Sequence, residues 1–259
     1  MKITSLVMAS ILALTTASAS AMVVTSSTDA TALATALGGS GVTISNATFS
    51  SLASSTAAGT FTGAADAIGF DKGVLLTTGT VNCAPGPNSQ SGCGIAGGDT
   101  TSLKFKFTSS TGNLFFKYVF ASEEYNEYVN QFNDMFELRL NGVNIAKLPG
   151  SGDDVSINNV NLNKNSAYFR NNATGASIPS LHLDTQYDGL TTVLTAFATG
   201  LSGTNEFEFL IKDQGDSEWD SGVFIQAGTF ASTDVPEPGS LALLGLGLAG
   251  LVARRRKKA

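Results

Sequence analysis

The chain has few of the residues on which most enzyme and metal chemistry depends. Among its 259 residues there are one His, two Cys and one Trp. The single His182 excludes every histidine-dependent catalytic triad except one built on that residue. Two cysteines with no His close in sequence are too few for the four ligands of a structural zinc site.

Positive charge is also scarce, and much of it lies at the two ends. The net charge is −6, and six of the 15 basic residues are Lys2 and residues 254–258. The segment between the ends, 22–234, holds nine basic and 20 acidic residues and therefore carries a net charge of −11. Nucleic-acid binding is not expected, because neutralising phosphates requires a basic surface. The surplus of carboxylates suits divalent cations instead.

Charged residues of both signs are uncommon. They make up 14% of the chain, against an ordinary share of about a quarter. Glycine is frequent at 28 residues, and hydrophobic residues at 42% are sufficient to build a core. This composition is typical of an extracellular bacterial β-protein rather than a cytosolic helical enzyme.

The N-terminus has the layout of a secretory signal peptide. Lys2 precedes an apolar run at 6–14, and Ala19-Ser20-Ala21 offers small residues for cleavage. We expect residues 1–21 to form a signal-peptide helix that is cleaved after Ala21. A buried N-terminal helix is the weaker alternative, because the run is short and ends in small polar residues.

The C-terminus, 235–259, combines a short motif, an apolar segment and a basic cluster. In order these are Val235, Pro236, Glu237 and Pro238, then residues 241–253, then a tail that begins with Arg254, Arg255 and Arg256. Thirteen helical residues extend for only about 20 Å, so the arginines must reach the interface for the segment to cross about 30 Å of hydrocarbon. The basic end is expected in the cytoplasm, which places the body outside.

This tail resembles the PEP-CTERM sorting signal. The resemblance implies a Gram-negative bacterium whose exosortase recognises the signal, removes the short transmembrane helix and passes the protein to the cell surface or exopolysaccharide matrix. The chain would then be held in the inner membrane only until it is processed. A plain membrane anchor is the alternative, but it would not need the Pro-Glu-Pro motif.

Residues 22–234 predict an all-β fold, a single β-sandwich or jelly-roll-like domain. Short runs either alternate between apolar and polar residues or are rich in β-branched residues, and Gly, Asn and Asp turns separate them. The predicted strands are 74–78, 104–107, 114–120, 136–140, 144–148, 155–162, 191–197, 206–209 and 223–230. A short helix is expected at 32–37, and 195–201 fits a helix as well as a strand.

The two cysteines lie in one loop. Cys83 and Cys93 are ten residues apart, with Gly, Pro and Asn between them. In an exported chain this spacing predicts a local disulfide.

Two segments gather carboxylates. The first contains Glu123, Glu124 and Asp134, and the second contains Asp213, Asp216 and Asp220. Crowded carboxylates repel one another, and a hard cation such as Ca²⁺, which takes six to eight oxygen ligands, relieves that repulsion. The six residues are therefore candidate calcium ligands, and a solvated acidic loop is the equally weighted alternative.

The body resembles the choice-of-anchor L domain, a family of bacterial surface domains. The resemblance rests on Phe120-Ala-Ser-Glu-Glu-Tyr-Asn-Glu-Tyr128, on Phe132-Asn-Asp-Met-Phe136 and on the segment 211–224. It implies a β-sandwich on an exported protein and supplies no reaction or ligand.

Two functions follow as hypotheses. The first is an exported, non-catalytic protein of the extracellular matrix or biofilm, bound to exopolysaccharide and stabilised by calcium. The second is a surface carbohydrate-active enzyme that uses the acidic segments, since paired carboxylates serve glycoside hydrolysis. Trp219 could stack on a sugar ring, but it is favoured as a residue that pins the acidic loop to the core.

Overall fold

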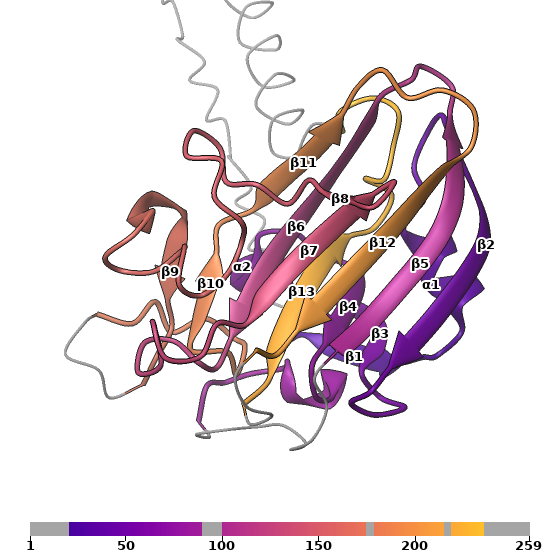
Figure 1. Cartoon of the computed structure of the whole chain (residues 1–259). Helices are drawn as coiled ribbons and strands as arrows, with labels where there is room; N and C mark the ends of the chain where they lie inside the picture. The colour runs from indigo at the N-terminus through magenta and orange to yellow at the C-terminus, as the bar shows by residue number, and fades with distance from the viewer. Residues whose placement is uncertain (1–20, 90–99, 175–178, 215–218, 236–259) are drawn as a thin grey trace, which may run out of the picture.

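Two antiparallel sheets pack face to face in the computed structural model of the chain (Figure 1), which confirms the predicted all-β sandwich. The structure describes residues 21–89, 100–174, 179–214 and 219–235. The larger sheet has the strand order β1 (Val23–Ser26), β3 (Ala58–Thr62), β4 (Gly73–Thr77), β13 (Ser221–Gln226), β6 (Leu114–Ser122), β10 (Gly189–Thr191) and β9 (Phe169–Asn171). Its eighth strand, β11 (Leu194–Ala198), pairs with β6 beside β10.

The smaller sheet has five strands in the order β2 (Val42–Ser51), β5 (Thr100–Ser109), β12 (Asn205–Lys212), β7 (Met135–Leu140) and β8 (Val143–Asn144). Its strands alternate between apolar and polar residues because one face of the sheet is buried and the other is exposed to solvent. In β12, Phe207 and Phe209 point into the core, while Glu206 and Glu208 point outward. Glu206 forms an ion pair with Lys104 of β5 at 2.8 Å. The alternation predicted from the sequence for these strands is confirmed.

The larger sheet is buried on both faces, which explains why its central strands are nearly all apolar. Val74 and Leu76 of β4 belong to the core between the sheets, whereas Leu75 faces a second cluster. That second cluster includes Phe61 and Phe224 and is covered by helix α2 (Ala65–Ile68). A strand with two buried faces reads as a continuous apolar run rather than an alternating one.

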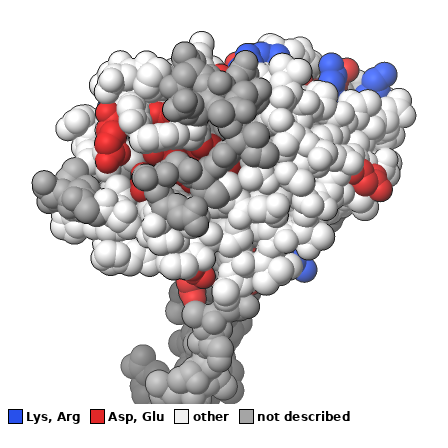
Figure 2. Space-filling model, turned by 90° about the horizontal axis from the view of Figure 1, so that it is seen from below, with Lys and Arg blue, Asp and Glu red and all other residues white. Residues whose placement is uncertain are grey.

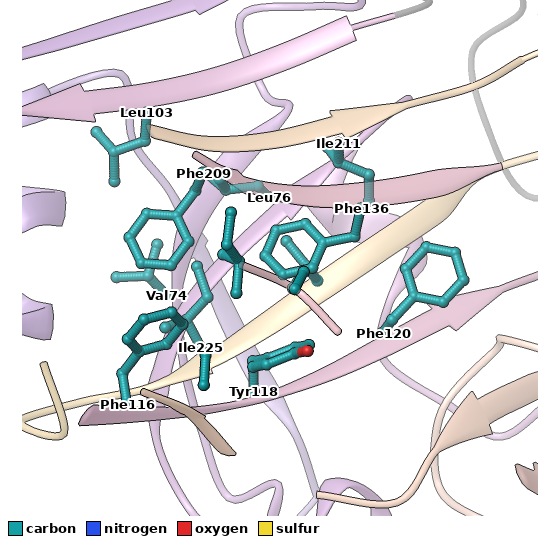
Figure 3. Packing of buried hydrophobic residues seen from close by; sticks show 14 of the residues in the cluster. Val74, Leu76, Leu103, Phe116, Tyr118, Phe120, Phe136, Phe209, Ile211 and Ile225 are labelled. Atoms are coloured by element: carbon teal, nitrogen blue, oxygen red, sulfur yellow. The ribbon is translucent and has the colours of Figure 1, made fainter. Parts of the chain in front are cut away.

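The core between the sheets is aromatic (Figure 3). Phe209 of β12 meets Phe116 of β6 edge to face at a ring-centroid distance of 5.5 Å, and Phe136 of β7 stacks on Phe209 at 6.4 Å. Tyr118 lies 5.2 Å from Phe136. The contacts of Phe116 with Phe209 and of Tyr118 with Phe136 join the two sheets, because β6 belongs to one and β7 and β12 to the other.

Helix α1 (Ala30–Leu37) lies against strands of both sheets, β4 of the larger and β2 of the smaller. It begins two residues before the predicted helix at 32–37. The Asp29 side chain accepts a hydrogen bond from Ala32 N at 3.0 Å and so caps the first turn. Leu33 and Leu37 are fully buried. The helix therefore forms because its N-cap residue and the spacing of its buried leucines favour a helix over the same residues.

Three strand predictions are correct only in part. Residues 144–148 contribute only Asn144 to a strand, and 223–230 is strand only to Gln226. Residues 191–197 are divided between β10 and β11, and the helical alternative for 195–201 is wrong.

Residues 155–162 form turns, not a strand. Asn161 Nδ2 donates to Ile157 O at 2.9 Å and Asn159 Nδ2 donates to Asp154 O at 3.0 Å, so side-chain amides satisfy carbonyls that a ladder would otherwise use. The segment is apolar because Val155 and Val160 pack against the core.

No helix in the described ranges is both long and apolar enough to cross a membrane. The predicted signal-peptide helix and the apolar segment 241–253 lie outside those ranges, apart from Ala21.

Candidate functional site: buried carboxylates at one end of the sandwich

Acidic residues follow or precede strands of the larger sheet at one end of the sandwich. β6 ends at Ser122, which pairs with Ser221 at the start of β13. Glu123 therefore follows β6 where Asp220 precedes β13, and Glu123 N donates to Asp220 O at 3.1 Å. Glu124 comes next, and its backbone N–H is held by Ser122 Oγ at 2.9 Å.

The smaller sheet brings two further carboxylates to the same end. Lys212 at the end of β12 pairs with Met135 at the start of β7. Asp213 thus follows one strand where Asp134 precedes its neighbour. Figure 2, which views this end of the molecule, shows Asp and Glu atoms gathered in a hollow. The carboxylates in this end cluster, Glu123, Glu124, Asp134, Asp213 and Asp220, are at most 9% exposed.

Asp220 is held by the segment that follows β4. Its Oδ1 accepts hydrogen bonds from Gly79 N at 2.8 Å and from Thr78 Oγ1 at 3.2 Å. Thr78 Oγ1 in turn accepts from Ser221 N at 2.9 Å. Burial raises the pKa of the Asp220 carboxyl to about 8, and these hydrogen bonds oppose that rise.

Ser221 connects Asp220 to Asp134. It follows Asp220 in sequence, and its Oγ donates to Asp134 Oδ2 at 2.6 Å. Gln214 N donates to the other oxygen of Asp134 at 3.3 Å. The charge of Asp134 contributes to the raised pKa of Asp220, so the two carboxylates share one electrostatic environment.

Two buried tyrosines complete this environment. Burial raises the pKa of the Tyr187 phenol well above its usual value, and the charges of Asp220 and Glu123 add to the rise. Burial likewise raises the pKa of Tyr125, and Asp134 adds to it. Each charged neighbour that acts on either phenol is a carboxylate.

The structure brings together some of the predicted calcium ligands. Asp134 and Asp220 meet around Ser221, and Glu123 lies beside Asp220 through the backbone. Glu124 and Asp213 lie at the same end, and Asp216 is outside the described residues. Within the described ranges, no three His, Cys, Asp or Glu side chains form a group that could hold a metal ion.

The structure shows the surroundings of two further candidate residues, Trp219 and His182. Trp219 packs edge to face on Tyr128, a half-buried residue of the segment after β6, with ring centroids 4.4 Å apart, and its role in pinning the loop to the core stays a prediction. His182 lies in an exposed loop and has a φ of 51°.

The remaining predicted sites fall partly outside the described residues. Cys83 is buried and is not a free thiol, while Cys93 lies outside, so their pairing stays a prediction. Ala21 and Val235 are described. Ala19, Pro236, Glu237, Pro238, Arg254, Arg255 and Arg256 are not.

Sequence reasoning missed Thr78, Ser221, Tyr125 and Tyr187 as members of this site. Thr78 lies 142 residues before Asp220, and the hydroxyl residues have no local motif. Only the pairing of β4, β6 and β13 brings them together.

These features define a β-sandwich domain with a buried acidic end. The chain belongs to the choice-of-anchor L domain family, whose model matches residues 22–231. Residues 234–257 match the PEP-CTERM protein-sorting motif. Together they make it an exported surface protein that is sorted by an exosortase in the membrane of a Gram-negative bacterium. Comparison with curated proteins and with solved structures gave no match.

Proposed function

We propose that the chain is a non-catalytic protein of the extracellular matrix that associates with exopolysaccharide and is stabilised by calcium. The observation that carries this proposal is the sorting motif at 234–257, which directly follows a family domain at 22–231. The family domain is thus followed by a motif for sorting by an exosortase. Its negative net charge also suits a matrix in which divalent cations bridge acidic groups.

The burial of the end cluster supports a non-catalytic role. A glycosidase needs two carboxylates that a sugar chain can reach from opposite sides of the scissile bond. Asp134 is 0% exposed and Asp220 is 2% exposed, and both are tied to neighbouring strands by hydrogen bonds. Such carboxylates are better placed to hold strand ends than to meet a polysaccharide.

A carbohydrate-active enzyme is the second candidate, and one observation favours it. Asp220 has a raised pKa beside a second carboxylate, Asp134, which is the arrangement of a general acid paired with a base. Asp134→Asn and Asp220→Asn separate the two functions. An enzyme loses turnover of the matrix polysaccharide with its melting temperature kept, whereas a structural cluster changes its melting temperature and has no turnover to lose.

Cell fractionation tests the matrix assignment. We expect the protein in the polysaccharide fraction of cells that carry the exosortase, and its release when that polysaccharide is digested. Glu237→Ala in the sorting motif should leave the protein in the membrane fraction, and Thr233→Ala, just before the motif, should not. Recovery of the unaltered protein only in membranes, or free in the medium with the polysaccharide intact, contradicts the proposal.

A further inference from the structure

Strand β11 is a free edge of the larger sheet. It pairs only with β6, and Figure 1 shows it at the border of that sheet with no described strand beyond it. Within the described part of the chain, residues 194–198 make no backbone hydrogen bond outside this pairing. An edge of this kind presents backbone donors and acceptors that another strand can use.

The bonding of β6 determines which backbone groups of β11 point outward. Phe115 N donates to Ala231 O at 2.9 Å and Ala231 N donates to Phe115 O at 3.0 Å, so Phe115 directs both of its backbone groups away from β11. Phe197 lies opposite Phe115. In an antiparallel ladder, a residue in such a pair also directs its N–H and C=O away from its partner. Since the pattern repeats every two residues, the backbone groups of Thr195 and Phe197 both face the free side of β11.

The side chains at this edge leave the approach to it open. Thr195 and Phe197 lie on the outer face of the sheet, and Phe197 is 65% exposed. Leu194 and Ala196 are buried in the core between the sheets, so they hold β11 in place as a strand. The segment 189–203 contains no charged residue and no proline, and the pairing of β11 with β6 has no bulge. Charge, proline and bulges are the usual means of protecting an edge, and β11 has none of them.

The other edge strands differ from β11. In β2 the register shifts between Ser45 and Thr48, where Asn46 has a φ of 52°. β8 and β9 are only two and three residues long. β1 is regular, but its four residues include no aromatic side chain that a partner could cover. Among the described strands, β11 therefore combines a regular, uncharged edge with an exposed aromatic residue.

We propose that two copies of this chain pair through β11 as antiparallel strands, about a two-fold axis at Ala196. In this register Thr195 of each copy lies opposite Phe197 of the other, and each of these two pairs exchanges two backbone hydrogen bonds. Ala196 lies opposite Ala196 of the other copy in a pair without hydrogen bonds, where Cα atoms approach to about 4.5 Å and a small side chain fits. The edge is complementary to itself because its outward groups are symmetric about Ala196.

The charge of the domain favours contact at this edge over contact elsewhere. Residues 22–234 carry a net charge of −11, so two copies repel each other over most of their surfaces. The uncharged segment 189–203 is where that repulsion is weakest. Pairing also packs Phe197 against Thr195 of the other copy, and an aromatic residue opposite a β-branched one is a favourable cross-strand pair. A two-fold contact uses both edges, so the assembly closes at two copies.

This interface is independent of the proposed association with exopolysaccharide, and sedimentation equilibrium of the full chain in density-matched detergent tests it. We expect the average mass to rise with protein concentration from one copy toward two. Phe197→Lys places a charge at the edge and should weaken the association by about tenfold or more. Val143→Lys is the matched control, because Val143 is 66% exposed on β8, and it should leave the association unchanged.

Cysteine cross-linking tests the register of the two strands. Ala196→Cys should form a disulfide between two copies under mild oxidation, because the two residues meet on the axis at a Cα separation that a disulfide spans. Ala198→Cys, two residues further along β11, should not, because the two copies of residue 198 are offset by about 13 Å along the strands. The unaltered chain controls for Cys83 and Cys93.

Four results would overturn the interface. One is a mass that stays at one copy at every concentration, with no cross-link in Ala196→Cys. The second is association that Phe197→Lys leaves unchanged, which assigns the contact to another part of the chain. The third is growth beyond two copies, and the fourth is equal cross-linking of Ala196→Cys and Ala198→Cys. The fractionation result that tests the matrix assignment stands in each case.

Discussion

Phe209 illustrates how individual side chains hold the two sheets together. It is fully buried on β12 and contacts Phe116 across the core as well as Phe136 and Phe207 within its own sheet. Its aromatic partners come from four strands, because Phe105 of β5 also lies 6.0 Å away, so neighbouring side chains cannot collapse into the space it leaves.

Phe209→Ala should therefore lower the free energy of unfolding by about 3 to 5 kcal/mol. Phe197→Ala is the comparison, because Phe197 is 65% exposed on β11 and its loss should change stability by less than about 0.5 kcal/mol. Urea denaturation followed by circular dichroism measures both. Equal losses in the two variants would show that the aromatic core does not carry the stability assigned to it.

Asp188 gives the domain a pH dependence below neutrality. Burial raises the pKa of its carboxyl to about 6, the charge of Glu127 adds to the rise, and a 2.7 Å hydrogen bond from Asn88 Nδ2 opposes it. In the unfolded chain the pKa is about 3.9, so the folded state holds its proton to higher pH. The resulting stability is complete below about pH 4 and is lost as the pH rises to about 6.

Asp188→Asn should remove this loss of stability at higher pH. Since Asp188 is only half-buried and partly screened by solvent, the difference in unfolding free energy between wild type and variant should change by about 1 kcal/mol between pH 4 and pH 7. Unfolding free energies at several pH values measure it, with the exposed Asp184→Asn as control. Parallel curves for wild type and Asp188→Asn contradict the assignment.

The residue types of the acidic end could be predicted from the sequence, but their arrangement could not. Glu123, Asp134 and Asp220 stand out as carboxylates at predicted strand boundaries. Whether they are buried, and that Thr78 and Tyr187 surround them, depends on strand pairings between residues about 100 or more positions apart. Local patterns carry no information about such pairings.

Among the secondary-structure elements, the alternation of apolar and polar residues predicted strands correctly where one face of the sheet is exposed to solvent. Strands β5, β7 and β12 all contain their predicted cores, and the five-stranded sheet exposes its charged face. The same reasoning failed at 155–162, since an apolar turn that covers the core has the same composition as a strand. In that segment, hydrogen bonds from Asn side chains to backbone carbonyls favour turns over a strand.

Helix α1 depends on its cap. Asp29→Ala removes the acceptor for Ala32 N and should cost about 1 kcal/mol of unfolding free energy, while Asp29→Asn, which keeps an acceptor oxygen, should restore most of it. Thermal unfolding of the three proteins checks this. A loss that persists in Asp29→Asn would point to the charge rather than the hydrogen bond.

The loop that begins at Cys83 should be closed by a disulfide to Cys93. Closing a loop of this length is expected to contribute about 2 to 3 kcal/mol. Protein purified from the periplasm and denatured without reductant should contain no reactive thiol. Two thiols per chain would contradict the pairing.

At the scale of the whole molecule, we expect processing at both ends. Ala19-Ser20-Ala21 predicts an N-terminus near Met22, and the match at 234–257 predicts removal of the apolar segment. Mass spectrometry of the surface form should find no peptide from Leu241 onward. Recovery of residues 254–259 from that form would replace exosortase processing with plain anchoring.

The position of β13 sets the order of events during secretion. It is the last strand in chain order, yet it lies between β4 and β6 in the middle of the larger sheet. The larger sheet therefore cannot close until Ser221–Gln226 has joined β4 and β6, so a chain that is secreted unfolded completes its sandwich only after this strand has crossed the membrane. Only eight residues separate Gln226 from Val235, where the sorting tail begins. Closure of the fold and arrival of the tail at the membrane thus become a single late step, and a secretion machine that handles unfolded chains can complete its work before the domain becomes rigid.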